Sequence, residues 1–366
     1  MKKFLALLVA FLLALGCLTA CGNEIPDGEV TTTAPEGEGN NTIDLSNPSL
    51  NINGVEIATE GLNVMNIGGV DVPFDEYRYM YYYLLSYYGM TADDLASQPE
   101  IFAEFLKIVE SYVVNGCWGE ILAKEYGITL TEADKAKIEE DLKAEKDAFE
   151  TEEAYYEALT NSGMSEDLLR RIITKNTLSE LVYNSLFGEG GQLLGTDEEI
   201  KADMKENYVR VYHLLISYEH FADDEAYSGL SAEEYKAEAL KLANEYLTKI
   251  QNGEVSVYDA AQAVGDDPGM ADNKEGYFFT YNTMVKEFET ASFELEVGGI
   301  SGLVETSYGW HIIEKLDHES YVEENFASLR DEYISTSFNN LVTNTLNEAE
   351  KTYFEGYESL DAHSIK

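Results

Sequence analysis

The chain is poor in the residues and motifs that mark the commonest enzyme classes. Its 366 residues include only five histidines and three cysteines, and they contain no Gly-x-Ser-x-Gly, Cys-x-x-Cys, His-Glu-x-x-His or phosphate-binding loop pattern. Those patterns supply the nucleophile, the dithiol, the zinc ligands and the phosphate cradle of large enzyme families. A metal site would also need further His or carboxylate ligands at fixed spacing, and none stands out. We therefore expect neither a metal nor a cofactor.

Positive charge is scarce as well. The chain has 24 Lys and Arg residues against 69 Asp and Glu residues, which gives a formal net charge of −45. Binding to nucleic acid needs basic patches, so nucleic acid is not an expected partner, and the protein surface is not expected to bind anionic lipid. Solubility through mutual repulsion explains the acidity without a specific function. Avoidance of anionic wall polymers and a preference for basic unfolded clients are the functional alternatives.

The first twenty residues indicate export. Two lysines precede an apolar run over residues 4–15, and the tetrapeptide Leu-Thr-Ala-Cys follows at 18–21. This order is typical of a secretory signal peptide over residues 1–20. The tetrapeptide fits a lipobox, in which Cys21 receives a diacylglyceryl group that anchors the protein; an ordinary cleaved signal with a coincidental cysteine is the alternative. We expect a lipoprotein at the extracytoplasmic face of the cell membrane of a Gram-positive-type bacterium.

Few cysteines remain for any other purpose. Processing would remove Cys17 and lipidation would occupy Cys21, so only Cys117 would keep a free thiol. An internal disulfide is then impossible, although export would permit one. Cys117 follows an apolar helical pattern, which favours a small buried hydrophobic side chain over a reactive thiol.

The remaining chain divides by composition and periodicity. Residues 21–61 are rich in Gly, Asn, Thr, Pro and Glu and predict a flexible tether. Residues 62–206 begin with a short hairpin and continue as amphipathic helices. Residues 207–317 mix strands and helices, and residues 318–366 form a helix whose apolar stripe needs a partner surface. We expect an α+β fold, in which a small antiparallel sheet flanked by helices (207–317) is inserted in an all-helical domain formed by the other two segments.

Tyrosine is unusually frequent in the first predicted helix. The chain has 26 tyrosines, and seven of them lie between residues 77 and 88. They are too many for one buried face. Packing in the core is one interpretation, and an adaptable surface for clients is the other, because tyrosine combines apolar area with a polar tip.

Two histidines lie in the middle of predicted strands. His213 stands in Tyr-His-Leu-Leu-Ile at 212–216, and His311 stands in Trp-His-Ile-Ile at 310–313. Taken alone, a strand histidine is more often a hydrogen-bonded core group than a ligand.

The order of further motifs around them resembles the parvulin family of peptidyl-prolyl isomerases. The strand 212–216 is similar to the first strand of that family, with its leading histidine. Asp266 falls where the family has its active-site Asp or Cys, and Met284 and Phe288 match the residues that line the proline pocket. The most specific piece is the stretch 304–313, which resembles the closing signature of the family.

The flanking segments agree with this resemblance. The expected lipoprotein tether, the helical N-terminal region and the C-terminal helix resemble the PrsA-type foldases of Gram-positive bacteria. SurA-type periplasmic chaperones are similar in plan but lack the lipid anchor.

The resemblance implies a site that works without covalent chemistry. Rotation about a prolyl bond breaks amide resonance at a barrier of roughly 18–20 kcal/mol. An apolar pocket that holds the ring and polar groups that favour the twisted amide are sufficient to lower that barrier. Met284 and Phe288 would hold the ring. The catalytic set implied by the resemblance consists of His213, Asp266, Thr306 and His311.

We therefore expect a peptidyl-prolyl cis-trans isomerase and foldase that assists unfolded exported polypeptides. One departure favours an alternative, because Glu275 falls at a position that is usually apolar in the proline pocket. A polar wall there would leave a non-catalytic holdase with a degenerate parvulin domain. A solute-binding lipoprotein is disfavoured, since no two-lobed α/β pattern is present.

Overall fold

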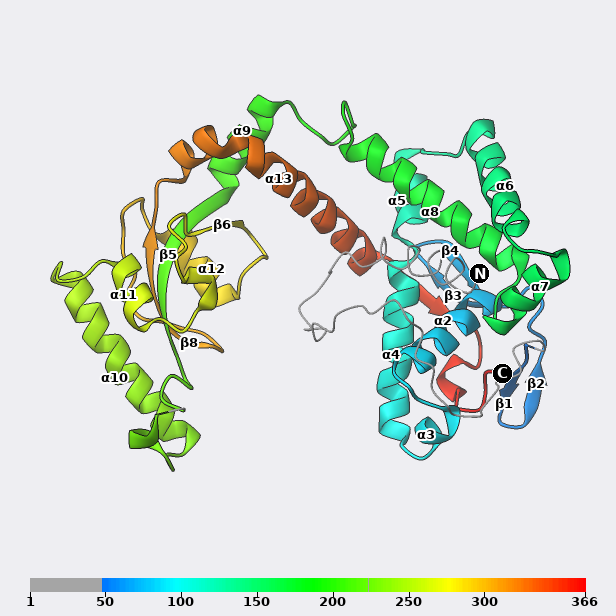
Figure 1. The fold of residues 1–366 in the computed structure, drawn as a ribbon, viewed down its shortest axis with the longest axis horizontal. Coiled ribbons are helices and arrows are strands. Elements are labelled where there is room, and N and C mark those ends of the chain that lie inside the picture. Colours follow the sequence, from blue (N-terminus) through cyan, green and yellow to red (C-terminus); the bar gives the residue numbers. More distant parts are fainter. Residues whose placement is uncertain (1–47, 223) are drawn as a thin grey trace. The chain divides into compact units, whose positions relative to one another are not determined.

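A computed structural model describes residues 48–222 and 224–366. The expected signal peptide, the lipidation site at Cys21 and most of the expected tether lie outside the described residues. The chain separates into two compact units (Figure 1). Unit 1 combines the residues up to 194 with residues 334–366, and unit 2 contains residues 195–333. Both units combine helices with small antiparallel sheets, so the fold is α+β as expected.

Most of unit 1 is helical. Its helices are α2 (Phe74–Tyr87), α3 (Ala92–Ala96), α4 (Pro99–Asn115), α5 (Trp118–Tyr126), α6 (Glu132–Asp147), α7 (Glu152–Asn161), α8 (Glu166–Phe187) and the later part of α13 (His318–Glu348). Local signals fix several of the ends. Thr131 and Asp134 form a capping box at the start of α6, and Gly127 ends α5 in the left-handed conformation with φ 68°.

Small sheets correct two expectations for unit 1. The strands are β1 (Leu50–Ile52), β2 (Val55–Ile57), β3 (Asn63–Ile67), β4 (Val70–Pro73) and β9 (Lys351–Tyr353), paired as β1-β2 and as β4-β3-β9. The domain is therefore not all-helical. The expected tether is too long at its C-terminal end, because Asn53 and Gly54 form a tight turn with φ 53° and 83° between β1 and β2. An Asn-Gly pair between short apolar runs favours such a hairpin.

The C-terminal segment binds to helix α2. The hydroxyl groups of Tyr81 and Tyr82 donate to the main-chain oxygens of Ala362 and Ile365, at 3.3 and 2.8 Å. Ser49 and Lys366 exchange two main-chain hydrogen bonds of 2.9 Å, which places both ends of the described chain side by side. Several tyrosines of α2 therefore hold the chain's own C-terminal segment.

A cluster of charged side chains lies between α2, α5 and α8 of unit 1. The Lys175 Nζ atom lies 2.6 Å from the Glu76 carboxylate and 3.2 Å from the Glu120 carboxylate. Arg171 lies 2.6 Å from Asp75 and 3.3 Å from Glu76. These five residues are called the charge cluster below. Cys117 is fully buried nearby, and burial raises the pKa of its thiol to about 12, so it is an unreactive core residue as expected.

Unit 2 is built around a four-stranded antiparallel sheet of order β6-β5-β8-β7. Its strands are β5 (Tyr208–Ser217), β6 (Tyr277–Thr280), β7 (Val304–Glu305) and β8 (Gly309–Lys315), and its helices are α9 (Asp197–Asn207), α10 (Ala232–Gln251), α11 (Val257–Val264), α12 (Lys286–Glu294) and the first part of α13. Short 3-10 turns lie at Glu225–Tyr227 and Pro268–Met270 in this unit and at Tyr357–Ser359 in unit 1.

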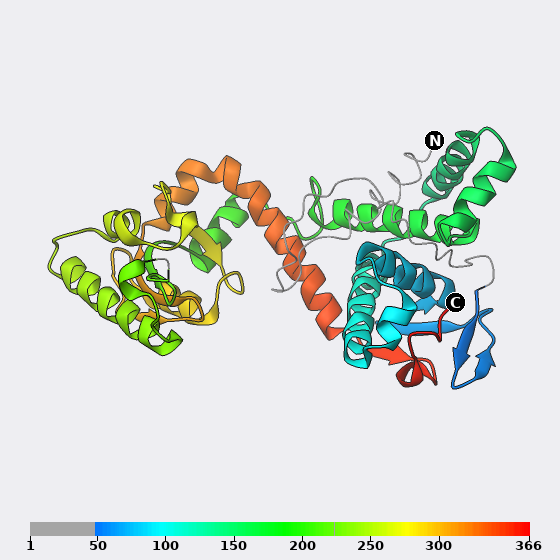
Figure 2. The ribbon, with the colours of Figure 1, turned by 60° about the horizontal axis from the view of Figure 1, so that its bottom comes forward.

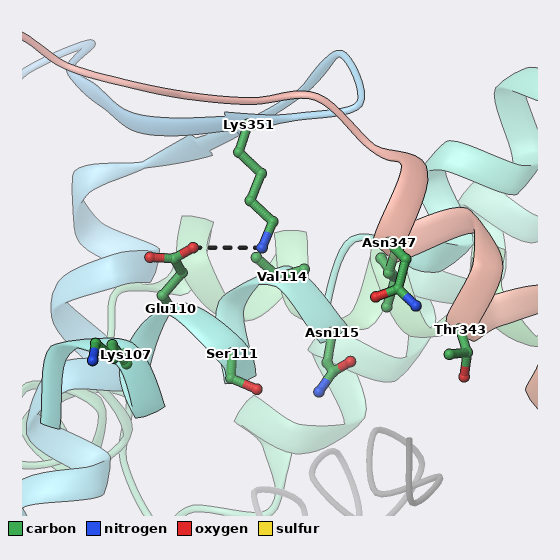
Figure 3. Close-up of a pocket in the computed structure, with 9 residues that line it drawn as sticks. Lys107, Glu110, Ser111, Val114, Asn115, Thr343, Asn347 and Lys351 are labelled. Carbon is green, nitrogen blue, oxygen red and sulfur yellow. Dashed lines mark hydrogen bonds and ion pairs between the residues drawn. The ribbon is translucent and has the colours of Figure 1, made fainter. Parts of the chain in front are cut away.

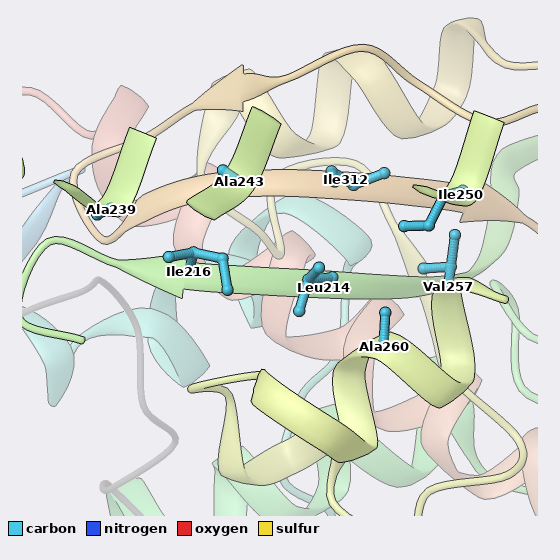
Figure 4. Close-up of a cluster of buried hydrophobic side chains, with 8 residues drawn as sticks. All are labelled: Leu214, Ile216, Ala239, Ala243, Ile250, Val257, Ala260 and Ile312. Atoms are coloured by element: carbon cyan, nitrogen blue, oxygen red, sulfur yellow. The ribbon is translucent and has the colours of Figure 1, made fainter. Parts of the chain in front are cut away.

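The two faces of this sheet have separate cores. Leu214, Ile216 and Ile312 face helices α10 and α11, where they pack on Ala239, Ala243, Ile250, Val257 and Ala260 (Figure 4). The opposite face carries Val209, Val211 and Ile313, which pack against Phe279 and Phe288 and thus against helix α12. Because successive strand residues point to opposite faces, the strand positions between those of the first core lie on the α12 face.

Helix α13 is one continuous helix that contributes to both units (Figure 2). Its residues up to Tyr333 belong to unit 2, where Arg330 pairs with Asp197 at 3.0 Å. Its later residues belong to unit 1, where Phe338 packs edge-on against Trp118. The expected C-terminal helix over 318–366 therefore ends at Glu348. Among the described residues, no helix combines the length and apolarity that crossing a bilayer requires.

Candidate functional site

The two strand histidines meet on the α12 face of the unit 2 sheet. Strand β5 pairs with β8 so that His213 lies opposite Ile313 and Leu215 lies opposite His311. The histidines are therefore diagonal neighbours on one face. Their Nδ1 atoms are 3.2 Å apart, and both side chains are buried.

A chain of hydrogen bonds extends from this pair in both directions. His213 Nε2 lies 2.7 Å from Asp267 Oδ2, and His311 Nε2 lies 2.9 Å from Thr306 Oγ1. The main-chain N–H of Tyr308 donates to Thr306 Oγ1 at 3.1 Å. Asp267, His213, His311 and Thr306 are called the histidine chain below.

The carboxylate of Asp267 ends the histidine chain and is held by further donors. The Gly269 main-chain N–H donates to it at 2.8 Å, and the Tyr277 hydroxyl donates to it at 3.0 Å. The hydrogen bond with His213 is the main reason that the pKa of Asp267 falls to about 2. Burial, and then the charge of Asp267, raises the pKa of Tyr277 to about 12. Asp267 is thus an ionised hydrogen-bond acceptor at neutral pH.

Burial also fixes the charge of His311. Burial lowers the pKa of this imidazole to about 3, and the neighbouring His213 lowers it further in the same direction. A neutral His311 and an ionised Asp267 allow one consistent proton arrangement when His213 is neutral. Thr306 then donates to His311 Nε2, His311 Nδ1–H donates to His213, and His213 Nε2–H donates to Asp267. Every group in the histidine chain is satisfied in this arrangement.

Apolar side chains border the histidines. The Phe288 ring on α12 lies with its centroid 4.9 Å from that of His213 and 5.2 Å from that of His311, in edge-on geometry. Met284 packs partly buried against the same apolar cluster. The structure therefore brings together the expected site residues His213, His311, Thr306, Met284 and Phe288.

Asp266 occupies a different place from the expected one. Its carboxylate accepts the Ser217 main-chain N–H at 2.7 Å and lies 2.8 Å from His220 Nδ1, and it makes no contact with the histidine pair. The neighbouring Asp267 binds His213 instead. Successive side chains of an extended segment point in different directions, so only one of two adjacent aspartates can reach the pair. The sequence contains both aspartates, but it does not show which of them points towards His213.

Glu275 is not brought to the site. Its carboxylate pairs with Arg210 at 2.9 Å, and 65 % of its side chain is exposed. Arg210 also stacks over the Tyr321 ring at 4.1 Å, which keeps the guanidinium away from the histidines. The polar wall that the sequence predicts at Glu275 stays a prediction, and the structure shows this side chain paired with Arg210.

Sequence reasoning missed the importance of Asp267, Tyr277 and His220. The signal for Asp267 was present as a second acid beside the chosen one. Tyr277 stands in the aromatic strand β6, where its hydroxyl gave no sign of a polar partner. His220 lies in the loop between β5 and α10, which none of the sequence motifs includes.

Unit 1 contains a separate cleft of about 280 Å³ (Figure 3). It is lined by residues of α4, of the end of α13 and of β9, including Ser111, Asn115 and Asn347. Glu110 and Lys351 form an ion pair of 3.5 Å across it. The described part of the chain holds no group of His, Cys, Asp and Glu side chains arranged to bind a metal ion.

A large part of unit 2 matches a known protein family. Residues 213–317 match the family described as Rotamase, the PPIC-type PPIASE domain. The Foldase protein PrsA of Halalkalibacterium halodurans is 32% identical over 201 residues, covering 53% of this chain and 54% of that protein. The peptidyl-prolyl cis-trans isomerase pin1 of Schizosaccharomyces pombe is 36% identical over 107 residues, covering 29% of this chain and 61% of that protein. The chain thus spans between half and two thirds of the length of these two relatives.

Two solved structures that are similar to this chain carry the name peptidyl-prolyl isomerase. The crystal structure of peptidylprolyl isomerase PrsA from Bacillus anthracis is 20% identical, with a TM-score of 0.34, and covers 64% of this chain and 96% of that chain. The peptidyl-prolyl isomerase ESS1 from Candida albicans is 29% identical, with a TM-score of 0.26, and covers 31% of this chain and 64% of that chain. The family match and the sequence relatives confirm the resemblance to the parvulin family.

Proposed function

We propose that this chain is a peptidyl-prolyl cis-trans isomerase that acts as a foldase on unfolded or partly folded exported polypeptides. The observation that carries the proposal is the histidine chain beside the Phe288 ring. It combines an apolar surface with a fixed array of polar groups, and all of its donors and acceptors are paired.

Such an array suits a reaction in which no covalent bond is broken. A proline ring would rest against Phe288 and Met284, while the amide before it rotates through the twisted state. Twisting removes resonance, so the nitrogen regains its lone pair and becomes a hydrogen-bond acceptor, while the carbonyl oxygen loses part of its negative charge. Preorganised dipoles in a water-poor site stabilise that change without reorganising. A neutral His311 fits this role, because its hydrogen bonds orient Thr306 and His213 and it takes up no proton at neutral pH.

The extracytoplasmic location belongs to the same proposal. It is supported by the signal-peptide pattern over residues 1–20 and by the lipobox at Cys21, and by the relatives named Foldase protein PrsA. A lipid anchor on Cys21 would hold the protein at the membrane, where exported chains emerge unfolded. Unfolded chains are the substrates in which cis prolyl bonds are common and slow to exchange.

The test is cis-to-trans isomerisation of short X-Pro peptides by the full mature chain. We expect turnover above the uncatalysed rate, and we expect His213→Ala to lower kcat/KM by about a hundredfold because the histidine chain is cut in the middle. Glu219→Ala, an exposed change in the same unit, is the matched control and should keep wild-type turnover. Absence of turnover in a folded wild-type chain would contradict the isomerase proposal.

A holdase role for unit 1 is the second candidate, and the cleft between α4, α13 and β9 is the observation that favours it. The predicted polar wall at Glu275 also favours this candidate, although its carboxylate pairs with Arg210 at 2.9 Å. The two roles are separable by measuring suppression of client aggregation with the His213→Ala variant. Suppression at the wild-type level would assign holding to surfaces outside the histidine chain, and its loss would assign both roles to that site.

A further inference from the structure

A second histidine–aspartate contact lies next to the histidine chain and outside it. Both carboxylate oxygens of Asp266 lie 2.8 Å from His220 Nδ1, and Oδ2 also accepts the Ser217 N–H at 2.7 Å. Both side chains are largely covered, with 25 % of Asp266 and 18 % of His220 exposed. Neither residue contacts His213 or His311, so the proposed isomerisation does not use them directly.

These contacts lie beside the part of strand β5 that has no partner strand on one side. Strand β6 pairs only with residues 208–211 of β5, so the later part of β5 has no strand neighbour on that side. The segment around Asp266 takes its place. The Asp266 main-chain N–H donates to the Leu215 oxygen at 3.0 Å, and its carboxylate accepts the Ser217 N–H. The side chain thus supplies the acceptor that a neighbouring strand would otherwise provide.

The same segment determines where Asp267 points. It leaves helix α11 through Gly265, where an added Cβ would lie 2.5 Å from the Ala261 oxygen, so the main chain passes close to the helix end. It continues into the short turn that begins at Pro268. Between these two fixed points, the bonds made by Asp266 are what hold the main chain against β5.

We propose that Asp266 and His220 are positioning residues, which fix the main chain before Asp267 and so hold Asp267 against His213. The inference rests on the proposed isomerase function. Asp266 acts on the main chain through its two donors, the Ser217 N–H and the His220 imidazole. His220 supplies the second of these donors and lies in the long loop after β5.

The loop that carries His220 has an aromatic core of its own. The His220 ring lies edge-on to Phe221, with centroids 4.8 Å apart, and Phe221 stacks on Tyr227 at 4.3 Å. The Tyr235 hydroxyl on α10 donates to the Tyr227 oxygen at 3.3 Å. His220 therefore connects this aromatic cluster to the segment that bears Asp267 through its contacts with the Asp266 carboxylate.

The test compares His220→Ala with His220→Asn in the full chain. The Asn side chain can place an N–H donor where the imidazole Nδ1–H lies, whereas Ala removes the donor. We expect His220→Ala to lower kcat by on the order of tenfold with KM little changed, because displacement of a positioned group costs rate more than binding. His220→Asn should recover most of the loss, and Glu219→Ala in the same loop should show none.

A second measurement needs no turnover. Imidazole ¹⁵N NMR of the substrate-free protein follows the Nε2–H proton that His213 shares with Asp267. In His220→Ala this proton should exchange faster with water, and in His220→Asn it should exchange at nearly the wild-type rate. Unchanged kcat and unchanged exchange in His220→Ala would overturn the positioning role, and so would an Asn variant as impaired as the Ala variant. Absence of turnover in the wild type would contradict only the proposed function, since the exchange comparison would still decide the positioning role.

Discussion

The two units bury polar side chains in opposite ways. In unit 1 the charge cluster sets full charges against each other, with Lys175 between Glu76 and Glu120. In unit 2 the histidine chain uses imidazoles and a hydroxyl that lead to one carboxylate, and an apolar ring lies beside it. The first arrangement joins three helices, and the second orients groups that carry little charge.

The difference shows what each kind of burial is suited to. Opposite charges buried together depend on each other, because removing one leaves the other without compensation. The histidine chain contains one ionised carboxylate and leaves a single consistent arrangement of protons, so a proton added to a buried imidazole disrupts it. We therefore expect the charge cluster to govern stability and the histidine chain to govern turnover and acid sensitivity.

Breaking the charge cluster should give the largest effect. Lys175→Met leaves Glu76 and Glu120 without their shared cation and should destabilise unit 1 by about 3–5 kcal/mol. Urea unfolding followed by Trp118 fluorescence measures this in a Trp310→Phe background, because the chain has 2 tryptophans and each lies in a different unit. The exposed pair of Lys107 provides the control, and Lys107→Met should change stability by less than about 0.5 kcal/mol. Equal effects of the two substitutions would contradict the structural role of the cluster.

Acid should act on unit 2 through His311. Burial lowers the pKa of the His311 imidazole from its usual 6.5 to about 3 in the folded protein, so between these pH values the unfolded state binds more protons and stability falls as the pH falls. The pKa of Asp267 is lowered from its usual 3.8 to about 2 in the folded protein. This carboxyl group therefore also makes stability fall as the pH falls through that range. We expect unit 2 to lose about 2–3 kcal/mol between pH 7 and pH 4.

The measurement is unfolding followed by Trp310 fluorescence in a Trp118→Phe background. His311→Gln removes the titrating group and should flatten the pH dependence, whatever its effect at pH 7. Burial lowers the pKa of Lys175, but its carboxylate neighbours raise it more, to about 12. Its contribution to unit 1 is therefore constant over this range. An equally steep pH dependence in His311→Gln would show that other groups are responsible.

Gly269→Ala tests how much the Tyr277 hydroxyl contributes to holding Asp267 in the histidine chain. A Cβ at this position would lie 1.8 Å from the Tyr277 hydroxyl, so the hydroxyl must leave Asp267. Turnover should fall by about tenfold, since Asp267 loses one of its donors and its orientation. Tyr277→Phe should show the same loss if the hydroxyl is the cause. Gly302→Ala, where the Cβ would meet no atom within 4 Å, is the control and should keep wild-type turnover.

The smallest effect is expected at Glu275. Glu275→Leu removes an exposed partner of Arg210, so turnover on X-Pro peptides should stay within about twofold of wild type, and stability within about 0.5 kcal/mol. A large rise in turnover would place Glu275 in the proline pocket and would support the holdase alternative.

Much of the site could be predicted because it depends on regular spacing. His213 and His311 stand in apolar strands whose period of two fixes the face they share once the strands pair. Phe288 lies on α12 and Met284 lies just before that helix, and the match of both residues to the family motif pointed to the one apolar cluster that they share. These residue positions can be identified from the sequence without any knowledge of tertiary contacts.

The parts that could not be predicted depend on contacts between distant segments. Asp267 rather than Asp266 reaches His213 because the Asp266 main chain is bonded to Leu215, a contact that spans about fifty residues. The tyrosines of α2 bind residues 362 and 365, which no local pattern connects to them. The Asn53-Gly54 hairpin differs from these contacts, because its turn has a local signal in the sequence.

The pairing of Ser49 with Lys366 has a consequence for the order in which the protein becomes complete. Unit 2 is continuous in sequence, whereas unit 1 needs residues 334–366 to supply β9 and the segment that covers the α2 tyrosines. A chain made and exported from its N-terminus presents the whole of unit 2 before these residues emerge. Until then strand β3 keeps one unpaired edge, which is the kind of surface that binds other extended chains. Unit 2 is therefore complete first, and unit 1, which contains both ends of the described chain, is complete last.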